Sequence, residues 1–122
     1  MNAIKTLMRL NSGNLWILVK LCLRFPLFVF PTMSATNKCM SISTQHYGRL
    51  HNKNGPANAF RHALWNYLIA KRCYAWIKNE TKVLNWSEKI TDWHEHAFPN
   101  RKLAQDMDLH NNRVGRYAFK IY

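Results

Sequence analysis

The pattern of apolar and polar positions predicts a buried helix in the middle of the chain, over residues 54–70. Apolar side chains occur on every side of this stretch, and a helix that is apolar all round is usually buried. Pro56 suits the first helical turn, with Asn54 or Gly55 as the cap before it.

This helix also carries a row of polar residues. Asn58, His62 and Asn66 recur at every fourth position, so they lie on one face. Buried polar groups cost free energy unless they are paired. The row therefore indicates either a structural hydrogen-bond network or a site.

The N-terminal apolar stretch, residues 14–30, predicts an amphipathic helix that packs on the core. Lys20, Arg24 and Pro26 interrupt it, which argues against a transmembrane helix, and Lys20 also argues against a signal peptide. An interfacial membrane helix is the alternative, because the basic residues and Trp16 are typical of one.

Two further segments precede the central helix. Pro26 and Pro31 bracket Leu27–Phe30, for which we expect an extended or irregular segment. Residues 34–50 are polar, with a short helix expected around Met40–Tyr47.

After a connection at 79–85, Ser87 is expected to cap a helix that ends near Phe98, before Pro99. His94 lies at the edge of the apolar stripe of this helix, and three polar residues are expected to point outward. The stripe is Trp86, Ile90, Trp93 and Ala97, and the outward residues are Asp92, Glu95 and His96.

The last helix is expected from about Leu103 to Tyr117 or beyond, with a stripe that turns His110 toward the core. Beside that stripe, small residues would let another helix approach where Asp108 and Asn111 project. The stripe is Leu103, Met107, His110, Val114, Ala118 and Ile121, and the small residues are Ala104 and Gly115.

These elements predict an all-α fold, a compact bundle of four to five helices with a polar site enclosed between them. At 122 residues the chain is expected to be a single domain, 1–122. Within it, residues 1–45 are an apolar, basic helical segment and residues 46–122 are the motif-bearing core. Three cysteines without metal-site spacing favour a reducing compartment, although a Cys39–Cys73 bridge stays open.

The charge is strongly unbalanced, with a formal net charge of +12. No acidic residue occurs before Glu80. Such an excess favours a polyanionic partner, either nucleic acid or anionic lipid, although a merely basic surface has the same composition.

Three polar segments on the predicted helices supply the histidines and carboxylates that bind divalent metals or act as acids and bases. They are Arg61-His62-x-x-x-Asn66, Asp92-x-His94-Glu95-His96 and Asp108-x-His110-Asn111-Asn112-x-x-x-Arg116. Each has a structural alternative: paired core polar groups, a solvated helix face, or an ion pair on the surface. No zincin, P-loop or nucleophile-elbow motif is present.

These segments together resemble an uncharacterised bacterial family with the pattern N-G-x-A-[DN]-A-x-R-H-x-x-W-N, then D-x-H-E, then M-D-x-x-N-N-x-x-G-R. The resemblance covers about residues 46–118, and the family includes small standalone proteins and C-terminal domains of toxin-like proteins. Many members have an acid where this chain has Asn58. The resemblance implies a shared site of Arg61, His62, Asn66, Asp92, His94, Glu95, Asp108, Asn111, Asn112 and Arg116, but no reaction.

The segment Arg61-His62-x-x-x-Asn66-Tyr67 is also locally similar to the catalytic helix of bacterial phospholipases A2. There, an Asp that follows the His binds Ca²⁺. This chain has Ala63 in that place and no glycine-rich calcium loop, so a lipid-directed His base fits it better than the calcium-dependent mechanism.

The favoured function is a small hydrolase of a phosphate-containing polyanion, with phospholipid slightly ahead of nucleic acid. His62 would be the general base, and Asp92, His94 and Glu95 would bind a divalent metal (Zn²⁺ or Ca²⁺) or orient the base. The other expected site residues would hold His62 or the metal, or neutralise phosphate charge: Arg61, Asn66, Asp108, Asn111, Asn112 and Arg116.

An antibacterial effector with an inhibitory partner protein is compatible with this function. The expected location is the bacterial cytoplasm or membrane, or outside the cell after delivery or secretion. The alternative function is a non-enzymatic basic protein that binds nucleic acid or anionic membrane and has a structural polar network.

Overall fold

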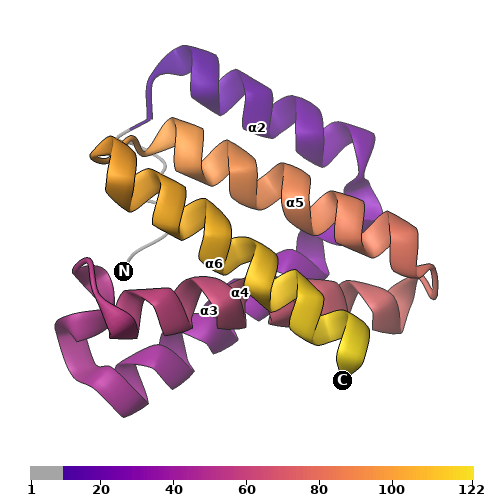
Figure 1. Ribbon diagram of the computed structural model, residues 1–122. Helices are drawn as coiled ribbons and strands as arrows, with labels where there is room; N and C mark the ends of the chain where they lie inside the picture. The colour runs from indigo at the N-terminus through magenta and orange to yellow at the C-terminus, as the bar shows by residue number, and fades with distance from the viewer. Residues whose placement is uncertain (1–9) are drawn as a thin grey trace.

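The computed structural model describes residues 10–122, in which every regular element is helical. The all-α prediction is therefore confirmed over this range. The elements are α2 (Ser12–Arg24), α3 (Pro26–Tyr47), the 3₁₀ helix η1 (Gly48–Asn52), α4 (Pro56–Trp76), α5 (Glu80–Ala97) and α6 (Lys102–Ile121). Helix α4 packs against α3, α5 and α6, whereas α2 packs against α3 and α5 (Figure 1).

The N-terminal half is more helical than the sequence predicted. The expected irregular segment Leu27–Phe30 forms the start of α3, and the short helix expected near its end is continuous with it. Pro26 occupies the first turn, where a missing N–H costs no helical hydrogen bond. Because α3 continues to Tyr47, the expected boundary between residues 45 and 46 falls inside a helix. Residues 1–9 of the expected N-terminal segment lie outside the described residues.

Helix α4 begins as predicted. Gly55 is its N-cap, at a positive φ of 147° that favours glycine, and Pro56 takes the first turn. The predicted polar row is buried: Asn58, His62 and Asn66 are 6%, 3% and 0% exposed.

Helix α5 begins seven residues before the expected cap at Ser87, because Asn79 caps it by accepting a hydrogen bond from the N–H of Lys82 at 3.0 Å. The connection expected at 79–85 is thus the first part of the helix. Ser87 lies within α5 and is fully buried.

Helix α6 extends over the expected range, but it faces the core with a different side. The predicted stripe is largely exposed; Leu103 is 74% exposed, and His110 also faces outward. The adjacent side is buried through Ala104, Asn112 and Gly115. The expected close approach is confirmed, because a Cβ atom at Gly115 would lie 2.0 Å from the carbonyl oxygen of Ala63 in α4.

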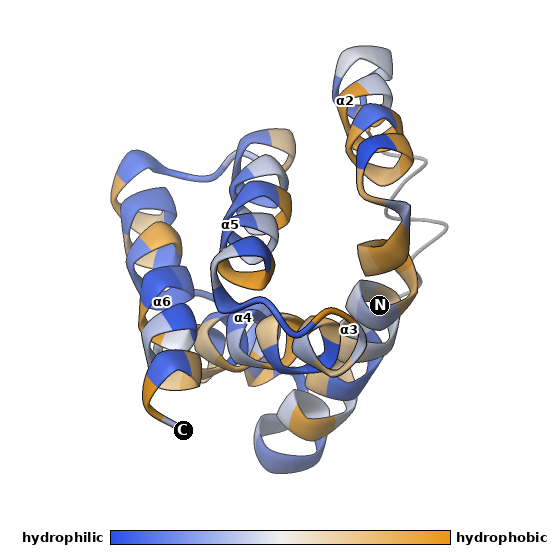
Figure 2. Cartoon of the chain, turned by 90° about the vertical axis from the view of Figure 1, so that its right-hand side faces the viewer, coloured by the Kyte–Doolittle hydropathy of each residue, from blue (hydrophilic) through white to orange (hydrophobic). Residues whose placement is uncertain are grey.

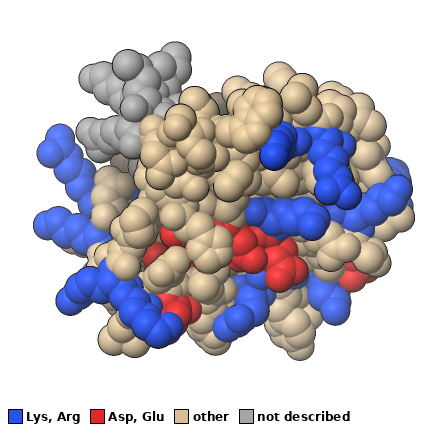
Figure 3. All heavy atoms as spheres, turned by 90° about the horizontal axis from the view of Figure 1, so that it is seen from above, with Lys and Arg blue, Asp and Glu red and all other residues tan. Residues whose placement is uncertain are grey.

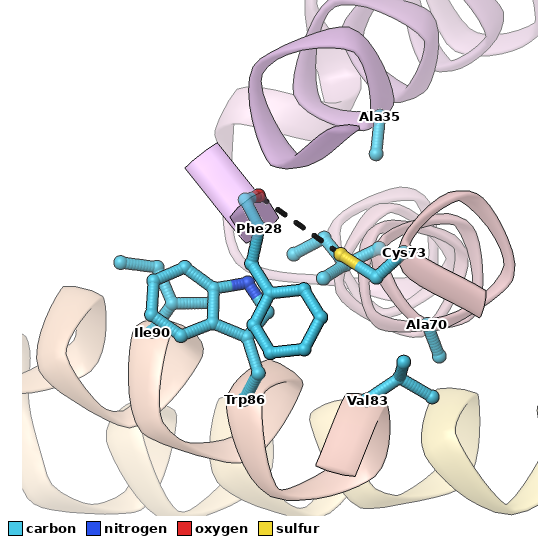
Figure 4. Close-up of a cluster of buried hydrophobic side chains, with 8 residues drawn as sticks. Phe28, Ala35, Ala70, Cys73, Val83, Trp86 and Ile90 are labelled. Carbon is cyan, nitrogen blue, oxygen red and sulfur yellow. Dashed lines mark hydrogen bonds between the residues drawn. The ribbon is translucent and has the colours of Figure 1, made fainter. Parts of the chain in front are cut away.

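A hydrophobic cluster joins α3, α4 and α5 (Figure 4). The ring of Phe28 packs on Trp86 with centroids 5.6 Å apart, beside the buried Cys73. All three cysteines are free, so the Cys39–Cys73 bridge does not form.

Helix α2 lies to one side of the other helices (Figure 2). None of its residues is fully buried, although Leu18 and Leu21 pack against the hydrophobic cluster. Within residues 10–122, no single helix is long and apolar enough to span a membrane. Helix α2 and the segment Pro26–Asn52 meet that requirement only together, and they are bent by 116°.

Candidate functional site

Three helices bring together a histidine and two carboxylates. Nε2 of His62 in α4 lies 3.4 Å from Oε1 of Glu95 in α5 and 3.7 Å from Oδ2 of Asp108 in α6. His62 and Glu95 are buried, and the side chain of Asp108 is 15% exposed. We call these three residues the His–Glu–Asp centre.

The His62 ring is held by a backbone group one turn earlier in α4. Its Nδ1 lies 2.9 Å from the carbonyl oxygen of Asn58. A carbonyl oxygen only accepts hydrogen bonds, so Nδ1 is the donor. This contact fixes the ring and directs Nε2 at the two carboxylates.

Glu95 faces inward, which corrects the expectation that it points to solvent. It is 4% exposed, and Oε1 also lies 3.1 Å from Nδ1 of His94. Its second oxygen, Oε2, is buried without a hydrogen-bond partner among the described residues. An unpartnered buried carboxylate oxygen is costly, and a bound ligand at this position would remove that cost.

The centre perturbs the ionisation of its members. Burial alone would lower the pKa of His62, but contact with Glu95, the Asn58 carbonyl and the carboxylate charges raise it. Burial would raise the pKa of Glu95, yet its contacts with His62 and His94 hold it at about 2. Burial raises the pKa of Asp108, against the opposing attraction of His62. The pKa shifts of His62 and Glu95 therefore both favour the charged forms, because each group stabilises the charge on the other.

The same three residues lie close enough together that they could hold a metal ion. One ligand atom from each lies within 4.8 Å of the other two. Ligands of a tetrahedral Zn²⁺ with bonds of about 2.1 Å lie about 3.4 Å apart, close to the distances from His62 to both carboxylates. A metal-binding histidine usually donates its other N–H to a carbonyl or carboxylate, as His62 does to Asn58.

A second polar cluster, centred on Asn66, lies next to this centre but makes no recorded contact with its side chains. Asn66 donates to the side chain of Asn112 at 2.8 Å and accepts from Arg116, Thr91 and Ser87 at 2.8, 3.0 and 3.1 Å. Every oxygen and nitrogen of the Asn66 side chain is thereby paired, which is the arrangement of a structural network.

The remaining predicted site residues are more dispersed. Arg61 donates to Asn52 at 3.2 Å and contributes positive charge near Asp108 and Glu95. Asn111 lines a small surface pocket together with Asp108. Asp92 is half-buried near the charge of Arg116, and no recorded contact joins it to His62. Of the predicted metal set of Asp92, His94 and Glu95, only Glu95 belongs to the group whose ligand atoms lie within 4.8 Å of one another, which is His62, Glu95 and Asp108.

A cavity of about 360 Å³ lies between α2, α3, α4 and α5, and His62 of the His–Glu–Asp centre forms part of its lining. Apolar side chains form most of its wall, and the guanidinium and imidazole side chains that line it are those of Arg61, His62 and His94. Its volume falls in the range of about 300–1,000 Å³ that is usual for small-molecule sites.

A protein-family comparison matches residues 19–122 to the family described as "Domain of unknown function (DUF6973)". The chain belongs to this family. The match includes all three members of the His–Glu–Asp centre and the whole of α3, so the family extends further toward the N-terminus than the resemblance at residues 46–118. Comparisons with curated proteins and with solved structures each found no match.

Sequence reasoning missed the inward face of α5 in this DUF6973 domain, although a signal was present. Ser87, Thr91 and Glu95 recur at every fourth position, like the polar row of α4. All three are buried and face that row. The cavity had no comparable signal, because its wall comes from residues on four helices that are far apart in sequence.

Proposed function

We propose that this protein is a metal-dependent hydrolase of a phosphate-containing polyanion, with phospholipid ahead of nucleic acid. The observation that carries the proposal is the convergence of His62, Glu95 and Asp108, which are contributed by three helices. The buried and unpartnered Oε2 of Glu95 supports a bound cation at this point.

The geometry favours a cation-ligand role for His62 over a general-base role. Nδ1 donates to Asn58, and Nε2 faces two carboxylates, so neither nitrogen is free to take a proton from a water on the substrate side. A divalent cation would lower the pKa of a bound water and so supply hydroxide near neutral pH. His94 and Arg61 line the adjoining cavity, where they can contact an anionic substrate.

The charge distribution supports an anionic substrate. On the face drawn in Figure 3, acidic atoms form a band across the middle, and Lys and Arg atoms lie widely spread around it. Two of the six acidic residues, Glu95 and Asp108, belong to the centre. The open basic surface therefore favours approach of a polyanion.

The test combines elemental analysis with hydrolysis of phospholipid vesicles and nucleic acids. We expect about one Zn²⁺ or other divalent ion per chain. His62→Ala, Glu95→Gln and Asp108→Asn should lose both the ion and the activity. His96→Ala is the matched control, because His96 is exposed on α5 near Glu95.

Retained metal and activity in all three variants would refute the proposal. If the wild-type protein holds no metal and hydrolyses neither substrate, the alternative is a non-enzymatic basic protein. Its binding to nucleic acid or anionic membrane would then fall steeply with added salt. A toxin-like effector role, with an inhibitory partner and delivery out of the cell, is a further proposal that growth inhibition on expression would test.

A further inference from the structure

The wall of the large cavity has few free polar groups because its tryptophans are already hydrogen-bonded. Trp65 donates to Thr36 at 3.0 Å, and Trp86 donates to Thr32 at 2.8 Å. The indole N–H of Trp93 donates to the carbonyl of Asn14 at 3.0 Å. An occupant of this wall is therefore held by apolar contact, which suits a hydrocarbon better than a polar ligand.

The cavity meets the His–Glu–Asp centre at His62, the one member of the centre that lines it. His62 lines the cavity and also contacts Glu95 and Asp108. His94 lines it as well, with its ring against Trp65 at a centroid distance of 5.0 Å. The cavity lining is thus mostly apolar, with the Arg61 guanidinium as its charged group and the His62 and His94 rings beside it, which matches the mixed character of an amphiphile.

The outer surface of α2 and the start of α3 is apolar and lacks acidic residues. Trp16, Leu23, Leu27 and Phe30 are 58%, 74%, 58% and 68% exposed. Acidic residues begin only at Glu80, so any charge on this surface is positive. Exposed apolar side chains with basic neighbours are typical of segments that lie at an anionic membrane interface.

We propose that the cavity binds the acyl chain of an anionic phospholipid, with the lipid phosphate at Arg61 and His94. The inference rests on the proposed function only for the reaction that the bound lipid would undergo. Binding of the acyl chain in the cavity does not depend on that reaction. A bilayer at α2 and α3 would be the source of the lipid, because these helices form the cavity's outer wall.

Other occupants fit less well. A single turn of a partner helix, about 10 Å across and about 5.4 Å long, already has a larger volume than the cavity of about 360 Å³. A nucleotide would leave its polar base edges against a wall whose own donors are already paired. A single hydrocarbon chain meets both constraints.

The test measures binding of lysophosphatidylglycerol, below the concentration at which it forms micelles, by titration calorimetry. Glycerophosphoglycerol, the same headgroup without the chain, is the comparison probe. We expect saturable binding of the lysolipid at about one per chain and an affinity about tenfold or more above that of the headgroup.

Variants that fill the cavity should weaken this binding. Cys22→Trp and Val29→Trp place a large ring among the lining residues, and each should lower the affinity about tenfold or more. Leu23→Trp is the matched control, because Leu23 lies beside Cys22 but is 74% exposed and does not line the cavity. Circular dichroism must show that each variant is folded.

A second measurement does not depend on the variants. Cys22 lines the cavity, so a bound chain should slow its alkylation in the wild-type protein, while glycerophosphoglycerol should not. Equal affinity for lysolipid and headgroup, or unchanged alkylation of Cys22 at saturating lysolipid, would overturn the inference. Hydrolysis of nucleic acid without lysolipid binding would overturn it and leave the proposed function standing. Lysolipid binding without any hydrolysis would support this inference and refute the proposed function.

Discussion

Gly115 of α6 rests directly on the backbone of Ala63 in α4. A Cβ atom at position 115 would lie 2.0 Å from the Ala63 carbonyl oxygen and 2.9 Å from its Cα. The obstructing atoms are main-chain atoms of a central helix, which cannot swing aside as a side chain would. This contact sets the spacing between the helices that carry His62 and Asp108.

Gly115→Ala should therefore force α4 and α6 apart. Overpacking of this kind costs about 1–3 kcal/mol, so we expect a lower free energy of unfolding in urea together with weaker metal binding. Gly13→Ala is the control, because the nearest atom to an added Cβ there is a side-chain oxygen at 3.4 Å. Equal stability of the Gly115 variant and the wild type would contradict the close packing.

Asn66→Ala should destabilise the fold more than it disturbs the site. The substitution removes the partner that Arg116, Thr91 and Asn112 share, and a buried polar group that is left unsatisfied costs about 1–3 kcal/mol. Urea unfolding should show a loss of at least about 2 kcal/mol, with metal content retained in the folded fraction. Asn111→Ala, outside this network, should change stability by less than about 0.5 kcal/mol.

Metal should stabilise the protein against heat through the His–Glu–Asp centre. A ligand that binds only the folded state at 100 times its dissociation constant adds about 2.7 kcal/mol. Chelation should therefore lower Tm, and added Zn²⁺ should restore it. In Glu95→Gln the Zn²⁺ response should be lost, while His110→Ala, on the exposed side of α6, should keep it. An undiminished response in Glu95→Gln would exclude this carboxylate as a ligand.

The buried thiols predict a loss of stability in alkaline solution. Burial raises the pKa of both Cys39 and Cys73 from 9.0 to about 11. The unfolded chain loses these protons first, so the free energy of unfolding should fall between about pH 9 and 11, by about 2 kcal/mol for each thiol. Below pH 9 both states keep the protons and the effect vanishes.

Urea unfolding at a series of pH values would measure this slope. Cys73→Ala should unfold more easily at every pH, but its free energy of unfolding should decline less steeply above pH 9. The same slope in both proteins would show that other groups, such as lysines and tyrosines, cause the decline.

The exposed apolar surface of α2 should bind anionic membranes. Trp16→Ser combined with Leu23→Ser removes two exposed apolar side chains and should reduce sedimentation with phosphatidylglycerol vesicles about tenfold or more. Leu103→Ser combined with Val114→Ser removes comparably exposed side chains from α6 and should have little effect. Equal losses for both pairs would mean that membrane contact is not specific to α2.

The fold class and helix α4 could be predicted from the sequence, because Pro56 marks the start of this helix and its polar row marks the face that carries His62. The prediction of the buried face of α6 was wrong for a physical reason. Leu103, Met107 and Val114 have helical periodicity, yet the chain buries the adjacent face, whose Gly115 permits a closer contact than those side chains would allow. Local periodicity does not record which of two neighbouring faces packs better.

The prediction of an irregular segment between Pro26 and Pro31 was wrong for a similar reason. Pro26 and Pro31 suggested a break in the chain, but Pro26 starts α3 and Pro31 is accommodated five residues later within it. Packing on α4 and the Phe28–Trp86 contact stabilise this stretch, and both are long-range contacts that a local reading cannot include.

The contact between His62 and Asn58 has a consequence for how the site tolerates mutation. Asn58 supports His62 through its backbone carbonyl, while its side chain donates elsewhere, to the carbonyl of His51 at 2.8 Å. Any residue that keeps α4 helical supplies the same carbonyl, so substitutions at position 58 leave the ring's support in place. A scan that replaces side chains one at a time would therefore overlook a group on which the centre depends.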